Sequence, residues 1–216
     1  MLKKDGYPFK SKPFAHNYGI FQRKGKDSKT YQAMKKSAKF GIPHALEYMF
    51  EDKNAIPFKI SEKCCYRLKK ETSHKWASEN NKSINITGIK AEEGGNRATI
   101  NCTIFDKGGN LEKFHPLLVV SEEWEREFIK REKIDLCPLY LPPYNFKRTG
   151  CMGCPFTKNI QEYLNVMYKL LPNEYYQCLH LWKPVYDEYI RIGFRLKYYP
   201  HEKGVQMTIE DYLGEE

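Results

Sequence analysis

The chain has 216 residues, 41 % of them hydrophobic and 14 % aromatic, so it can bury the core of one ordinary domain and is not expected to be disordered. No run of about 18 apolar residues occurs, and the basic N-terminus lacks the apolar core of a secretory signal, so we expect no membrane span. Seven cysteines, two of them adjacent, suit a disulfide framework poorly and predict a reducing, cytoplasmic setting.

The net charge of +9 is concentrated early in the chain, in a basic arm over residues 1–40. Neutralisation of phosphates by lysine and arginine is the sequence-independent part of nucleic-acid binding, so this arm fits such a partner. No groove-reading motif accompanies the charge, and a solvated surface, or one that handles a nucleotide's phosphates, explains it without nucleic acid. Nucleic acid is therefore a weak partner prediction.

Helix and strand patterns follow one another along the chain. Capping residues or apolar residues at helical spacing predict helices at residues 28–39, 43–51, 61–71, 121–133, 158–171 and 173–192. Strand patterns occur at residues 84–89, 99–105 and 114–120, with a turn at 107–110. The last two helices are amphipathic, and we expect their aromatic stripe, which includes Tyr175, Tyr176, Trp182 and Tyr186, in the core. The pattern predicts a helix-rich α/β fold.

Four cysteines form two pairs that could converge on one metal centre: Cys64 with Cys65, and Cys151 with Cys154. Gly153 lets the Cys-x-x-Cys turn direct both sulfurs to one side. Neighbouring side chains on a helix diverge by about 100°, which suits the separate corners of a 4Fe–4S cluster better than one small ion. The sequence favours the cluster, with tetrahedral zinc, or core cysteines without metal, as the alternatives.

Charged side chains follow the first strand pattern. In parallel sheets ligands bind beyond the carboxyl ends of strands, so Lys90, Glu93 and Arg97 are well placed to meet an anionic substrate. An arginine can bind phosphate or sulfate through two parallel hydrogen bonds. Arg148, beside the second cysteine pair, is a further candidate anion contact. His115 is expected to be a packed, hydrogen-bonded residue more than a catalyst.

Several ordered motifs resemble the phosphoadenylylsulfate and adenylylsulfate reductase family. The Cys-Cys and Cys-x-x-Cys pairs resemble its cluster signature, residues 84–97 resemble its ITGIRxEES strand and loop, and residues 114–117 resemble its HPL strand end. The likeness runs from about residue 7 to residue 154. It is closest to a phage and mobile-element branch, in which GYPFxSK, PFKISxKCC and RTGCxGCPF recur.

The resemblance implies a partial adenine-nucleotide α-hydrolase-like fold, with a parallel sheet and a helical C-terminal lid. It places the family-like domain at residues 1–156 and a helical segment packed on the same core at residues 157–216. It also implies a 4Fe–4S cluster on the four cysteines, and ATP or a sulfonucleotide as ligand.

Two features of that family are expected to be missing: the SGGKDS phosphate loop, and a C-terminal catalytic cysteine, because Cys178 is the last cysteine. We therefore expect a separate chain, or a second copy in a homo-oligomer, to complete the phosphate site. The favoured function is a part in nucleotide-dependent sulfur transfer or sulfonucleotide processing. The alternative is a non-catalytic iron–sulfur module that binds nucleic acid or a protein partner.

Overall fold

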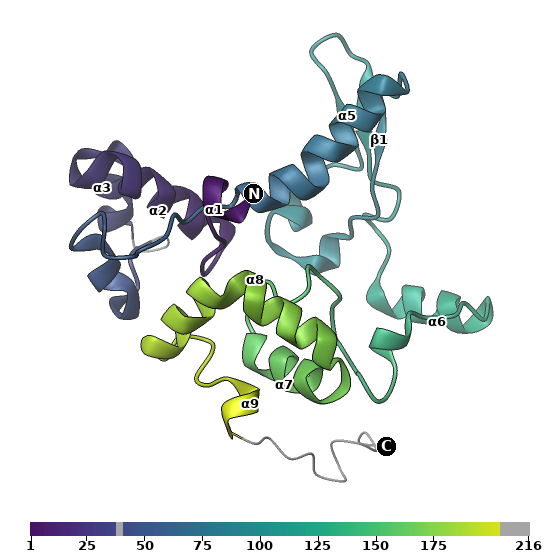
Figure 1. Cartoon of the computed structure of the whole chain (residues 1–216). Helices are drawn as coiled ribbons and strands as arrows, with labels where there is room; N and C mark the ends of the chain where they lie inside the picture. Colours follow the sequence, from purple (N-terminus) through teal and green to yellow (C-terminus); the bar gives the residue numbers. More distant parts are fainter. Residues whose placement is uncertain (38–40, 204–216) are drawn as a thin grey trace. The chain divides into compact units, whose positions relative to one another are not determined.

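The computed structural model describes residues 1–37 and 41–203 (Figure 1). The chain divides into two compact units, and the first contains Met1–Leu68 together with the chain from Cys137 onward. The second unit is Lys69–Leu136. These units describe where the chain is compact and not which parts fold independently. The domain boundary expected at residue 156 therefore stays a prediction.

Unit 1 is built from helices. Its α-helices are α1 (Leu2–Asp5), α2 (Lys12–Lys24), α3 (Lys29–Lys36), α4 (Lys63–Cys65), α7 (Ile160–Leu170), α8 (Pro172–Arg191) and α9 (Pro200–Lys203). Unit 1 also has the short 3₁₀-helices η1 (Gly25–Asp27), η2 (His44–Phe50) and η6 (Pro138–Tyr140). Helices α2 and α3 lie side by side, as do α7 and α8 (Figure 1).

Aromatic residues at helical spacing hold the N-terminal part of unit 1 together. Ser11 caps α2, because its hydroxyl accepts a hydrogen bond from the Phe14 amide at 3.3 Å. Phe14, Tyr18 and Phe21 then repeat along one face of α2 and pack against the ring of Phe50 at the end of η2. The segment at 43–51, predicted as a helix, is thus a 3₁₀-helix that supplies a core aromatic.

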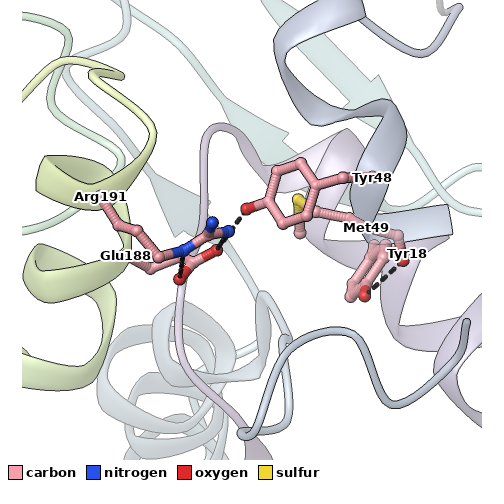
Figure 2. A network of polar contacts seen from close by, with 5 residues as sticks. All are labelled: Tyr18, Tyr48, Met49, Glu188 and Arg191. Atoms are coloured by element: carbon pink, nitrogen blue, oxygen red, sulfur yellow. Dashed lines mark hydrogen bonds and ion pairs between the residues drawn. The ribbon is translucent and has the colours of Figure 1, made fainter. Parts of the chain in front are cut away.

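The C-terminal helices share this core. The ring of Phe9 packs against that of Tyr189 on α8, with centroids 4.8 Å apart. A polar network adds to the packing: Tyr48 on η2 donates a hydrogen bond to the Glu188 carboxylate, which also pairs with Arg191 at 2.6 Å (Figure 2). Helices at 158–171 and 173–192 are confirmed as α7 and α8, and Tyr175, Trp182 and Tyr186 are buried as predicted. The expectation for Tyr176 was wrong, because its side chain is exposed.

Unit 2 contains a small mixed sheet. Its elements are α5 (Thr72–Glu79), β1 (Asn85–Ile86), η4 (Ala91–Glu93), η5 (Gly95–Thr99), β2 (Thr103–Phe105), β3 (Leu111–Phe114) and α6 (Glu122–Arg131). A π-helix, η3 (Tyr66–Glu71), connects α4 to α5, so the helical stretch predicted to end at residue 71 continues to Glu79.

The strand order is β1-β3-β2, with β1 parallel and β2 antiparallel to β3. The helix-rich α/β class is confirmed, although the sheet is not wholly parallel. A tight turn joins β2 to β3, and such a turn can connect only antiparallel strands. The Asp106 carboxylate fixes this turn by accepting hydrogen bonds from the amides of Gly108 and Asn110, at 2.8 and 2.9 Å.

All three observed strands differ from the sequence patterns, and the strand predicted at 99–105 is confirmed only at Thr103–Phe105. The strand predicted at 114–120 was wrong beyond its first residue, because β3 is Leu111–Phe114. After it, Pro116 has no amide hydrogen for a sheet ladder and the chain turns. The strand predicted at 84–89 is reduced to Asn85–Ile86. The helix predicted at 121–133 is confirmed as α6, and Ser121 caps it by accepting from the Trp124 amide at 3.1 Å. No helix in residues 1–37 and 41–203 is long and apolar enough to cross a membrane.

Candidate metal centre and anion contacts

The first cysteine pair lies at the C-terminal end of the short helix α4, after a segment that the N-terminus holds in place. Tyr7 forms a bridge with this segment: its amide donates to the Lys59 carbonyl at 2.7 Å, and its carbonyl accepts from the Ser61 amide at 2.8 Å. Gly6 permits this approach, because a Cβ there would lie 2.8 Å from the Ser61 Cβ. The GYPF and KISxKCC motifs are therefore paired in space.

The second cysteine pair lies in a tight turn in which the Cys154 amide donates to the Cys151 carbonyl at 3.1 Å. Gly153 has a φ of +59°, which favours glycine. A Cβ on Gly153 would also lie 2.6 Å from both the Cys178 sulfur and the Tyr186 hydroxyl. The turn is therefore seated directly on α8, with the buried Cys178 beneath it.

Three aromatic side chains of α8 hold this turn by its carbonyl groups. The Trp182 indole donates to the Met152 carbonyl at 3.1 Å, Tyr186 donates to the Gly153 carbonyl, and Tyr189 donates to the Pro155 carbonyl at 3.0 Å. The three donors sit at i, i+4 and i+7, which is one face of a helix. Sequence reasoning placed Trp182 and Tyr186 in the core but did not assign them this positioning role, and it missed Tyr189. The i, i+4, i+7 spacing of these three aromatic residues was the only local sequence feature that could have indicated the positioning role.

Electrostatic contributions connect the two cysteine pairs within unit 1. Burial raises the pKa of Cys64 to about 12, and Cys65 and Cys154 contribute to the rise. Burial also raises the pKa of Cys154 to about 11, with further contributions from Cys151 and Cys65, while the Phe156 amide opposes the rise by hydrogen bonding to the sulfur. Burial thus favours the neutral thiol at Cys64 and Cys154, whereas a bound cation would favour the thiolate.

The donor set fits an iron–sulfur cluster in its chemistry. The two thiol pairs belong to one compact unit, Lys12 is close enough to Cys154 to oppose the rise in its pKa, and a backbone amide already donates to one sulfur. Across residues 1–37 and 41–203, however, no three Cys, His, Asp or Glu side chains are arranged to hold one metal ion. The role of Cys64, Cys65, Cys151 and Cys154 as ligands stays a prediction.

Three of the predicted substrate contacts, Lys90, Glu93 and Arg97, lie in unit 2, where each has a charged partner. Lys90 is paired with Glu125, and this hydrogen bond raises the pKa of the lysine. Arg97 is paired with Glu93 at 2.9 Å. An anionic ligand at Lys90 or Arg97 would therefore have to replace a carboxylate.

The fourth predicted substrate contact, Arg148, lies in unit 1, close in sequence to the second cysteine pair. Its backbone is held by the Tyr163 hydroxyl, which accepts from the Arg148 amide at 3.1 Å and donates to the Arg148 carbonyl at 2.8 Å. The structure thus places Lys90, Glu93 and Arg97 on one loop and Arg148 in the other unit. Their binding role is untested and stays a prediction.

His115 is a packed residue, as expected from sequence. It is 3 % exposed, and its Nδ1 atom lies 2.6 Å from the Thr87 hydroxyl. Its amide donates to the Cys102 carbonyl at 2.7 Å, which ties the end of β3 to the residue before β2. His115 therefore stabilises the sheet.

The sequence of the chain was compared with families of known proteins. The model of the phosphoadenosine phosphosulfate reductase domain matches residues 22–157, which is more than half of the chain. No curated protein and no solved structure matches. The matched region contains both cysteine pairs and the four predicted substrate contacts, Lys90, Glu93, Arg97 and Arg148.

Proposed function

Because the chain belongs to the phosphoadenosine phosphosulfate reductase domain family, we propose that it is an iron–sulfur protein that binds a sulfonucleotide or related nucleotide. The observation that carries the proposal is that two cysteine pairs far apart in the sequence lie in one compact unit, where Cys154 contributes to the raised pKa of Cys64 and Cys65 to that of Cys154. The second pair is also positioned by three hydrogen bonds from α8. A part in nucleotide-dependent sulfur transfer or sulfonucleotide processing follows from the family.

Cys64, Cys65, Cys151 and Cys154 would hold a 4Fe–4S cluster, which when bound supplies a polarising, redox-active centre. The residues of the chain do the positioning. The bridge of Tyr7 with the segment before α4 fixes the first pair, and the carbonyl contacts of Trp182, Tyr186 and Tyr189 fix the second. Hydrogen bonds from backbone amides to sulfur favour the thiolate form that metal binding needs.

For the nucleotide we propose the predicted contacts Lys90, Glu93, Arg97 and Arg148. Arg97 is the best placed of these in unit 2, because its side chain is 47 % exposed and its planar group can bind sulfate or phosphate by two hydrogen bonds. Glu93 then acts as the counter-charge that orients Arg97 before the ligand arrives. Since cluster thiolates must stay reduced, we also propose that the protein works in a reducing compartment such as the cytoplasm.

The test of the cluster is the content of iron, sulfide and zinc in protein purified without oxygen, together with its absorption spectrum. We expect about four irons and four sulfides per chain and a broad band near 400 nm. The band should disappear in a Cys64→Ser/Cys154→Ser variant. The matched control is Cys102→Ser/Cys137→Ser, which removes two exposed thiols and should keep the band. Zinc alone, or folded protein without metal, would refute the cluster.

The nucleotide proposal needs its own measurement. Calorimetric titration of the protein with adenosine phosphosulfate compounds should show saturable binding that is lost in Arg97→Ala. The Arg131→Ala variant is the control, because Arg131 is also a unit 2 arginine that pairs with a neighbouring glutamate. Equal binding by the wild type and Arg97→Ala would contradict the assignment of Arg97.

A further inference from the structure

Unit 1 contains a hollow that none of the predicted sites uses. It has a volume of about 510 Å³, within the range of small-molecule and chain-binding clefts. Its walls come from α1, α2, the start of α4 and the segment before α4. Five of its lining residues are cationic: Lys4, Arg23, Lys53, Lys59 and Lys63.

The charge of the hollow is not compensated. Among the described residues, none of these five cations forms an ion pair, and Asp5 is the one acidic residue in the lining. Asp5 already faces the Arg67 guanidinium at 3.6 Å. Five like charges around one concave surface repel one another, and a bound anion removes this cost.

The walls of the hollow are held in place without a ligand. The Gln22 side chain accepts from the Ile60 amide at 2.8 Å and donates to the Phe58 carbonyl at 2.9 Å, so the segment that carries Lys59 is fixed to α2. Gly19 allows the two to meet, because a Cβ there would lie 2.7 Å from the Ile60 carbonyl oxygen. The Arg23 guanidinium would lie 3.7 Å from the same Cβ position, so it is close to the point where Gly19 meets Ile60.

The lining also offers apolar surface. Ile56, Pro57 and Phe58 line the same hollow, and the Phe58 ring is partly exposed with its edge against Tyr7. Proteins that bind single-stranded nucleic acid combine cations that follow the phosphates with rings on which bases stack. A duplex would instead need an element that enters a groove, and a concave surface offers none.

We propose that this basic hollow binds consecutive phosphates of a single-stranded nucleic acid. The cations come from four separate chain segments around the hollow, so they can meet several phosphates in a row, and Phe58 is placed to meet a base. A free nucleotide carries the same phosphate chemistry on a shorter ligand and fills fewer of the five cationic positions. The proposal stands independently of the cysteine site.

The test is fluorescence anisotropy of a labelled 12-nucleotide oligothymidylate with the full chain at several salt concentrations. The variant is Lys53→Ala/Lys59→Ala, which removes two exposed lysines of the hollow. The matched control is Lys107→Ala/Lys130→Ala, which removes two exposed lysines of unit 2 and the same net charge. Melting temperatures of both variants check that they fold.

We expect the hollow variant to bind about tenfold more weakly at low salt, with the slope of log affinity against log salt reduced by about 1.4, while the control stays close to the wild type. Equal losses in the two variants would show binding by net charge alone and overturn the proposal. Absence of binding at low salt would overturn it as well. Displacement of the oligonucleotide by equimolar ATP would assign the hollow to free nucleotides instead.

Discussion

The Tyr189 hydroxyl donates a hydrogen bond to the Pro155 carbonyl at 3.0 Å and accepts one from the Lys10 amide at 2.7 Å. One side chain on α8 thus joins the N-terminal segment to the turn of the second cysteine pair. The Tyr189 side chain is fully buried, so water has no ready access to replace its hydroxyl if the hydroxyl is removed.

Tyr189→Phe should therefore lower the free energy of unfolding by about 1–3 kcal/mol, because the half-buried Lys10 amide loses its partner and the Pro155 carbonyl keeps only a longer contact with Arg195, at 3.4 Å. Urea unfolding measures the change. Tyr176→Phe is the control: Tyr176 is exposed, and its hydroxyl has no hydrogen bond within the described residues. We expect that variant to stay within about 0.5 kcal/mol of the wild type. Similar losses in both would contradict the buried role of Tyr189.

Gly153→Ala should lower both stability and the capacity of the second cysteine pair to hold metal. The new methyl group must displace Cys178 or Tyr186, and the backbone conformation is strained for alanine, so we expect a loss of about 1–3 kcal/mol or more. Thermal unfolding and iron content measure the two effects. Gly193→Ala separates them, because Gly193 has a φ of +65° and nothing within 4 Å of its Cβ position. If both variants lose the same stability, the contact with α8 is unimportant.

Stability should depend on pH through Glu188. Burial alone would raise its pKa, but hydrogen bonds from Arg191 and Tyr48 outweigh burial and hold the pKa of Glu188 below its ordinary value. A lowered folded-state pKa stabilises the fold above about pH 4.5, and this stability is lost as the pH falls through the lowered value. Glu188→Gln should weaken the fold at pH 7 and flatten its acid dependence.

Urea midpoints between pH 3 and pH 7 test this expectation. Glu51→Gln removes an exposed carboxylate from the end of η2 and should leave the acid dependence as it is in the wild type. An unchanged slope in Glu188→Gln would show that other groups dominate the acid response.

Thr87→Val should destabilise unit 2, because it removes the hydroxyl partner of the buried His115 Nδ1 atom. We expect a cost of about 1–3 kcal/mol, measured by chemical unfolding. Thr87→Ser keeps the hydroxyl and should recover most of the loss. A Thr87→Ser variant as unstable as Thr87→Val would point to the methyl group as the stabilising part of Thr87.

The helices were predictable because their signals are local. Ser121 as a cap and the apolar spacing of α7 and α8 depend on a few neighbouring residues, and these elements were confirmed. The position of β3 was predicted wrongly. The apolar residues after Pro116 suggested a strand at 114–120, which the proline prevents, and the strand lies at Leu111–Phe114 instead.

The cysteine pairs were visible as a pattern, whereas the residues that position them were not. The donors from α8 act on carbonyls about thirty residues earlier in the chain, and a tyrosine at helical spacing looks the same whether its hydroxyl meets backbone or solvent. The basic hollow was equally hidden. Two of its cations, Lys4 and Arg23, belong to the basic arm predicted over residues 1–40, while Lys53, Lys59 and Lys63 join them only through the fold.

Unit 1 is discontinuous in sequence, with residues 69–136 between its two halves, and this has a consequence for synthesis on the ribosome. Cys64 and Cys65 leave the exit tunnel long before Cys151 and Cys154, and the donors of α8 leave later still. The four thiols can come together only when nearly the whole chain has been made. Until then the first pair has no partner thiols, so loading of the proposed cluster would be a late event, and protection of Cys64 and Cys65 against oxidation would fall to the surrounding cell.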